Sequence, residues 1–105
     1  MNSLRLTASI AERGVLRYTP AGVPVAGCTL QHHAEVVEAG TVRQVELTIP
    51  AIAAGDVSGR LESCAMGEEK HFTGFLAKKS RNAKTLVFHI TEIIEITDVQ
   101  NTEKD

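Results

Sequence analysis

Residues 4–10 read Leu-Arg-Leu-Thr-Ala-Ser-Ile, with an apolar side chain at every second position and a polar one between. Successive side chains of a β-strand point to opposite faces, so this alternation predicts a half-buried strand. Four further strands are predicted along the chain, at residues 25–37, 45–49, 70–77 and 85–96. Pro50 is expected to end the third of these strands or to mark an edge or bulge in it.

The segments between these strands carry turn signals and little helical character. Residues 13–24 hold two prolines and two glycines and predict a loop, and residues 38–41 predict a short hairpin connection. Glycines interrupt residues 56–67, where we expect at most one helical turn at 60–66.

Five strands and no regular helix in 105 residues predict an all-β domain. The expected architecture is a five-stranded oligonucleotide-binding (OB) fold barrel, because closing a small sheet removes its exposed edges. An immunoglobulin-like sandwich would need about seven strands and a central tryptophan, and the chain has no Trp. We expect one domain over residues 1–97 and a short polar tail over residues 98–105.

The basic residues gather in two segments of a chain whose formal net charge is −2. Residues 70–91 carry five Lys or Arg residues and no acidic residue, and Arg13 and Arg17 lie in the predicted loop 13–24. In a five-stranded barrel, the loops that join strands 1–2 and 4–5 flank the face that binds oligonucleotides. This pattern favours local attraction of phosphates. The alternative is that lysines simply keep a hairpin tip in water.

The sequence resembles the PriB family of primosomal replication proteins in an ordered set of short segments. These are RYTPAGVP at 17–24, LQH at 30–32, VRQ at 42–44, IP at 49–50, GFLA at 74–77 and HI at 89–90. The similarity extends from about residue 2 to residue 96, in the same order and with similar spacing. That family is related to bacterial single-stranded DNA-binding protein, whose long glycine-rich and acid-tipped tail differs from the short polar end here.

The resemblance implies a homodimeric OB barrel that binds single-stranded DNA without base preference. It also implies a role in restarting stalled replication forks, by bridging DNA, the PriA helicase and the loading protein DnaT. It implies neither catalysis nor a cofactor, and no catalytic motif is present in the sequence. Carried over by position, the family's DNA contacts fall on Arg17, His33, Arg43, Lys78, Lys79, Arg81 and Lys84.

The aromatic content differs from that of some members of this family. They carry rings on the DNA face where this chain has Thr41 and Glu46. Stacking on a ring contributes about 1–3 kcal/mol per base, so this difference predicts binding mainly by charge. Tyr18 is a candidate for base stacking, with packing of its loop against the barrel as the alternative. Phe72 and Phe75 fall on opposite faces, so one belongs to the core and the other to a dimer interface or the DNA face.

This difference also leaves two other functions open. The barrel could be a protein-interaction module that docks replication proteins with only weak DNA binding, or a general single-stranded DNA-binding protein.

The histidines and cysteines do not predict a metal site. His32 and His33 are adjacent on a predicted strand and so point to opposite faces, and zinc-site spacing is absent. Cys28 and Cys64 lie 36 positions apart without a C-x-x-C pair. We expect free thiols in a reducing cytoplasm, with a single disulfide as the alternative. The first residues lack the apolar core of a signal peptide, and no apolar run approaches the ~18 residues of a membrane helix.

Overall fold

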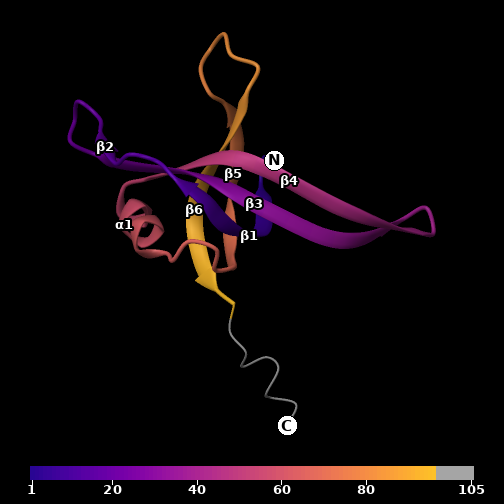
Figure 1. The fold of residues 1–105 in the computed structure, drawn as a ribbon. Coiled ribbons are helices and arrows are strands. Elements are labelled where there is room, and N and C mark those ends of the chain that lie inside the picture. The colour runs from indigo at the N-terminus through magenta and orange to yellow at the C-terminus, as the bar shows by residue number, and fades with distance from the viewer. Residues whose placement is uncertain (97–105) are drawn as a thin grey trace.

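The computed structural model describes residues 1–96, which form six strands and one short helix (Figure 1). They are β1 (Leu4–Arg13), β2 (Arg17–Tyr18), β3 (Pro24–Glu38), β4 (Thr41–Ala54), α1 (Asp56–Ser63), β5 (Lys70–Lys78) and β6 (Leu86–Glu95). The expected tail at 98–105, and Thr97 at the end of the expected domain, lie outside the described residues. No helix in this part of the chain is long and apolar enough to cross a membrane.

β1 closes the sheet into a barrel because it pairs with two other strands. Its first half, Leu4–Ala8, runs antiparallel to β5, and the second half runs antiparallel to β3. The remaining order is β5-β6-β4-β3, with β6 parallel to β4 and the short β2 added at the edge of β3. Five long strands therefore surround one core, which confirms the expected OB barrel.

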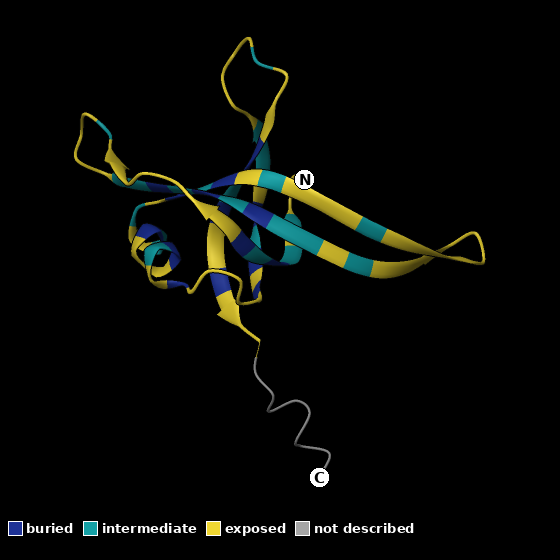
Figure 2. Ribbon diagram, in the orientation of Figure 1, coloured by how far each residue is buried: buried dark blue, intermediate teal, exposed yellow. Residues whose placement is uncertain are grey.

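Alternate residues of the long strands fill this core (Figure 2). Phe72 and Phe88 are fully buried there, and α1 packs against β3, β4 and β6 and adds Leu61. Phe75 lies three positions after Phe72 on β5 and is 37 % exposed. The expected division of these two rings between core and surface is therefore confirmed.

β4 continues through Pro50, so of the alternatives predicted for this residue the end of the strand is the one that does not hold. Pro50 lies opposite Thr29 of β3, and β6 pairs with β4 only at Ala51–Ala53. Pro50 thus lies where β4 has a single paired neighbour within the described residues. Because a missing N–H is tolerated at such an edge position, the structure agrees with the other predicted alternative, in which Pro50 marks an edge of the sheet.

Two elements depart from the predicted ones. Within the expected loop 13–24, β2 pairs Arg17 with Val25 and Tyr18 with Pro24. The helix α1 spans eight residues and begins at Asp56, four residues before the single turn that was expected. Gly59 disfavours a helix here, but burial of Leu61 against the barrel compensates because packing supplies most helix stability in proteins.

β3 and β4 extend beyond the barrel as a two-stranded ribbon (Figures 1 and 2). Their register is unbroken from Val25 opposite Ala54 to Glu38 opposite Thr41. Ala39 and Gly40 connect them with positive φ angles of 53° and 78°, as two-residue hairpin turns require. The expected hairpin at residues 38–41 is therefore confirmed.

Gly74 occupies a position in β5 where the barrel has no room for a side chain. A Cβ there would lie 1.8 Å from the carbonyl oxygen of His89 in the adjoining strand. We expect Gly74→Ala to lower the free energy of unfolding by about 3 kcal/mol or more, because backbone rather than a flexible side chain must move. Urea unfolding at a fixed protein concentration measures this loss.

Gly59→Ala is the matched control. A Cβ at Gly59, in α1, meets no atom within 4 Å. Because alanine favours a helix over glycine by about 1 kcal/mol, this variant should be neutral or stabilised. A Gly74→Ala protein as stable as the wild type would contradict the close approach of β5 and β6.

Candidate nucleic-acid interface

A groove of about 640 Å³ lies between the β1–β3 connection and the β5–β6 hairpin. Figure 1 shows these two loops on the same side of the barrel. The floor of the groove includes Gly27 and Thr29 of β3, Ile52 of β4 and His89 of β6. The two walls are far apart in sequence, and closure of the barrel brings them together.

Four basic residues line this groove, and the side chains of three of them have no hydrogen-bond or ion-pair partner within residues 1–96. Arg17 comes from β2, and Lys78 and Lys79 come from the end of β5 and the start of the hairpin loop. All three are exposed, and none forms an ion pair within residues 1–96. Glu12 is the acidic residue in the lining. The groove therefore offers a net positive surface to an anionic ligand.

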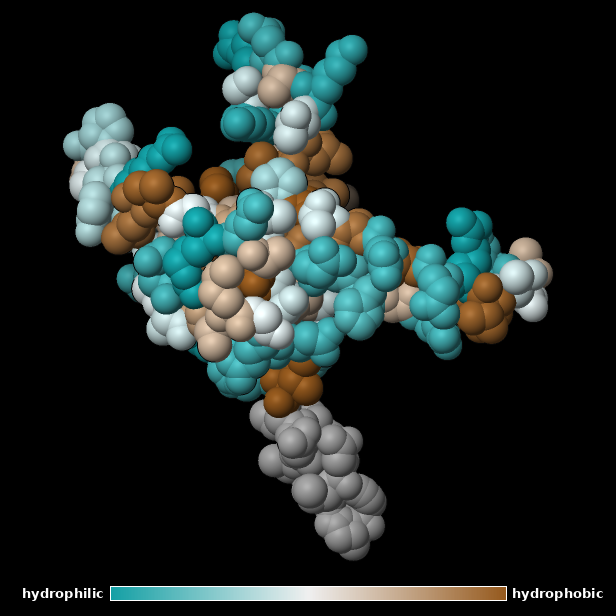
Figure 3. Space-filling view, in the orientation of Figure 1, coloured by the Kyte–Doolittle hydropathy of each residue, from teal (hydrophilic) through white to brown (hydrophobic). Residues whose placement is uncertain are grey.

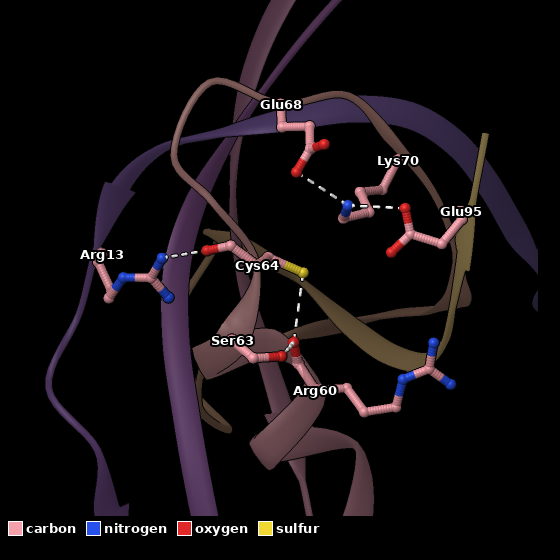
Figure 4. Close-up of polar contacts among 7 residues, drawn as sticks. All are labelled: Arg13, Arg60, Ser63, Cys64, Glu68, Lys70 and Glu95. Atoms are coloured by element: carbon pink, nitrogen blue, oxygen red, sulfur yellow. Dashed lines mark hydrogen bonds and ion pairs between the residues drawn. The ribbon is translucent and has the colours of Figure 1, made fainter. Parts of the chain in front are cut away.

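Arg13 also lines the groove, but its guanidinium group is bound to the end of α1. It donates to the carbonyl oxygens of Leu61 at 3.1 Å and Glu62 at 3.2 Å, and also to that of Cys64 (Figure 4). The last carbonyls of a helix lack partners within the helix and carry partial negative charge. Arg13 therefore stabilises the helix end, so its charge is already used within the protein.

Lys70 is likewise committed to internal pairing. Its side chain is buried, and its ammonium nitrogen lies 3.1 Å from a Glu68 carboxylate oxygen and 3.0 Å from one of Glu95 (Figure 4). The hydrogen bonds that Lys70 donates to these carboxylates, that to Glu95 foremost, raise the pKa of Lys70 above its ordinary value and keep it charged. Of the basic cluster at residues 70–91, this member is not available to a ligand.

Cys28 and Cys64 are both free and buried, so the structure has the expected thiols rather than a disulfide. Burial raises the pKa of Cys28 to about 11 and moves the pKa of Cys64 upward as well. Protonated thiols are poor nucleophiles and poor metal ligands. Residues 1–96 contain no group of three or more His, Cys, Asp or Glu side chains placed to hold a metal ion.

Arg81 and Lys84 lie in the β5–β6 hairpin loop, beyond the groove lining. Both are exposed, and the loop is held by hydrogen bonds from the Lys79 amide to the Thr85 carbonyl at 2.8 Å and from the Ala83 amide to the Ser80 carbonyl at 3.1 Å. Figure 3 shows the tip of this hairpin as a hydrophilic projection. These two residues extend the positive wall of the groove outward.

His33 and Arg43 do not lie in the groove or on one common face. Both belong to the β3–β4 ribbon, where His33 is paired with Glu46 and Arg43 with Val36. Because side chains alternate along a strand, these two pairs project from opposite faces of the ribbon. The Arg43 guanidinium lies 2.9 Å from a Glu38 carboxylate oxygen, and His33 lies 3.9 Å from one of Glu69.

Tyr18 is 66 % exposed on β2, which does not fit the alternative that its ring packs against the barrel. Thr41 pairs with Glu38 at the far end of the ribbon, and Glu46 is exposed halfway along it. The ribbon therefore carries a threonine and a glutamate at the two positions where the family resemblance had suggested aromatic rings.

The sequence-based interpretation missed a pair of stacked rings on the outer face of the barrel. Phe75 of β5 lies opposite His89 of β6, with ring centroids 4.7 Å apart and planes inclined by 13°. His89 also lines the groove. Phe72 and Phe75 are an odd number of positions apart on one strand, so the sequence already indicated that the two rings lie on opposite faces of the sheet. The pairing register of β5 and β6 was needed to show that His89 lies beside Phe75.

Comparison with known proteins agrees with this geometry. The profile of a family described as "Another single-strand binding protein family" matches residues 2–92. Replication restart protein PriB from Bordetella pertussis is 42 % identical over 92 residues, which cover 88 % of this chain and 86 % of the relative. The chain belongs to the PriB family.

Similarity to other PriB proteins supports the same family membership. PriB from Nitrosomonas europaea is 33 % identical over 91 residues, covering 87 % of this chain and 84 % of the relative. The structure of PriB from Ralstonia solanacearum has a TM-score of 0.83 and 43 % identity, and the match covers 92 % of this chain and 99 % of that one. The single-stranded DNA-binding domain of a Synechococcus protein, at 23 % identity and a TM-score of 0.66, shares the fold.

The different roles of two neighbouring arginines predict different effects of their removal. We expect Arg13→Ala to lower the free energy of unfolding by about 2 kcal/mol, because three carbonyl groups lose a charged donor. Arg17→Ala should change stability by less than about 0.5 kcal/mol, since Arg17 is an exposed residue. Thermal and urea unfolding of both variants measure the difference, and equal stabilities would show that the contacts to α1 contribute little.

Proposed function

We propose that this protein binds single-stranded DNA and acts in the restart of replication. The observation that carries the proposal is the groove, in which Arg17, Lys78 and Lys79 are exposed and form no ion pair within residues 1–96. The groove lies between the loops that flank the oligonucleotide-binding face of OB folds. Membership of the PriB family, whose members bear the name replication restart protein, supports the same function.

We propose that binding is mainly electrostatic. Arg17, Lys78 and Lys79 would hold phosphates in the groove, and Arg81 and Lys84 would extend the contact along the hairpin. The exposed ring of Tyr18 is available for stacking on a base. His33 and Arg43 would act further along the β3–β4 ribbon, on opposite faces, where a strand could reach only one of them without wrapping around.

We further propose a homodimer. The edge of β1 opposite β5 has no strand partner at Leu4–Ala8 within residues 1–96. At this edge the Thr7 carbonyl oxygen accepts a hydrogen bond from a ring nitrogen of His32 at 2.7 Å. Unpaired strand edges readily pair with another chain, so a second copy of β1 is a suitable partner.

The bridging of DNA to PriA and DnaT, and a cytoplasmic location, follow from the resemblance to the PriB family and are proposed on that basis. A binding role without catalysis is proposed on the same basis. A second candidate function, docking of replication proteins with only weak DNA binding, is favoured by the ribbon. Val36, Val37 and Val42 are 43 %, 73 % and 59 % exposed near its tip, and apolar residues at such a projection suit a protein contact.

Removing the hairpin charges provides the test of electrostatic binding. We expect reversal of charge at Lys79, Arg81 and Lys84 to weaken binding of a labelled single strand of about 30 nucleotides. This length is about twice the largest number of nucleotides that one OB fold covers. The slope of log affinity against log salt should also fall by about 2, since each lost phosphate contact on a single strand removes about 0.7. Fluorescence anisotropy titrations at two salt concentrations measure both effects.

The control variant exchanges Lys79→Arg, Arg81→Lys and Lys84→Arg, which keeps the charge and should keep the salt slope. Unchanged affinity and slope in the charge-reversed variant would overturn the assignment of the hairpin. Absence of tight binding by the wild type at moderate salt would favour the protein-docking function instead.

The dimer has its own test. Sedimentation equilibrium should give twice the 11.3 kDa mass of one chain, and amide exchange at residues 4–8 should slow as the protein concentration rises. A monomer at all concentrations would contradict the dimer, and a dimer without protection at β1 would place the interface elsewhere.

A further inference from the structure

The stack of Phe75 on His89 belongs to a row of residues that crosses the outer face of the barrel. Gly27 lies opposite Ile52, Ile52 is in register with His89, and His89 lies opposite Phe75. The first three members line the groove described above, and Phe75 is the next residue along the row. The row therefore leads directly from the basic groove to an exposed aromatic ring.

A second hollow, of about 340 Å³, adjoins this stack. Phe75 and His89 line it together with Asp56 and Val57 from the start of α1, and Ala54, Ile90 and Thr91 complete the lining. His89 is shared by the groove and the hollow. The volume is at the lower end of the range of about 300–1,000 Å³ that small ligands occupy in proteins.

The lining of this hollow fits a flat and weakly polar group better than a phosphate. It is mostly apolar, contains the Phe75 ring, and carries no Lys or Arg. Asp56 is exposed and takes part in no ion pair within the described residues, so its negative charge repels phosphate. The same carboxylate accepts hydrogen bonds from amino groups, such as those on the edges of cytosine, adenine and guanine.

We propose that the hollow holds one nucleobase of the strand that passes through the groove, stacked on Phe75 and with its edge turned toward Asp56. This inference rests on the proposed binding of single-stranded DNA. Phosphates remain over Arg17, Lys78 and Lys79, and one base turns past His89 into the hollow. Phe75 thus supplies an aromatic surface for stacking, which Thr41 and Glu46 on the ribbon do not.

The main test compares Phe75→Leu with the wild type on two strands of equal length, oligo(dC) and a strand of abasic deoxyribose phosphate. Leucine keeps an apolar side chain at this exposed position, and unfolding measurements check that the fold is retained. We expect Phe75→Leu to bind oligo(dC) about 5-fold more weakly or worse, the effect of losing one stacked base. Binding of the abasic strand and the salt slope should stay unchanged.

Lys79→Ala is the contrasting variant, since it should lower the salt slope on both strands. If the wild type binds neither strand, the proposed function fails and this inference fails with it. If the wild type and Lys79→Ala behave as expected but Phe75→Leu binds oligo(dC) like the wild type, only the base pocket is overturned. Loss of dimer formation or of a protein contact in Phe75→Leu, with DNA binding intact, would assign the hollow to a protein partner and overturn it also.

Asp56→Asn tests the orientation of the base. Removing a negative charge should strengthen binding to any strand, so the readout is the ratio of affinities for oligo(dC) and oligo(dT). In contrast to the absence of base preference that the family resemblance implies, we expect the wild type to favour oligo(dC), because thymine presents an oxygen where cytosine presents an amino group. The preference should shrink in Asp56→Asn. A wild-type ratio of one, or a ratio that the variant does not change, would contradict the contact with Asp56.

Discussion

The double pairing of β1 is the constraint on which the rest of this structure depends. One half of the strand is bound to β5 and the other to β3, so five long strands form a closed barrel. A register shift between Ile10 and Glu12 and the bare backbone at Gly74 allow the curvature this requires. Closure also brings the β1–β3 connection beside the β5–β6 hairpin, and the groove exists because these two walls meet.

Closure of the barrel gives some basic residues partners inside the protein and leaves others exposed to a ligand. Arg13 and Lys70 are paired inside the protein, with helix carbonyls and with two carboxylates respectively. Arg17, Lys78 and Lys79 remain exposed in the groove. A mildly acidic chain can therefore present a positive surface to DNA, because what matters to a phosphate is the local field and not the net charge.

The proposed binding surface combines two physical effects in one continuous path. Charge in the groove acts over a Debye length and weakens with salt, whereas a base stacked on Phe75 would be held by contact and desolvation. The two effects have separate experimental signatures because one follows phosphates and the other follows bases. In a chain with only four aromatic residues, the position of each exposed ring has a large influence on how a single strand can be held.

The sequence alone determined the strand alternation, the hairpin at residues 38–41, the OB barrel and the resemblance to the PriB family, because period-two patterning and turn residues are local properties. It also located the basic segments, of which Arg17, Lys78 and Lys79 meet in one groove. Only the tertiary structure decided that α1 forms despite Gly59, that Arg13 is bound to it, that His33 and Arg43 point apart, and that Phe75 stacks on His89. These features depend on pairing register and on contacts between distant segments, which no local pattern encodes.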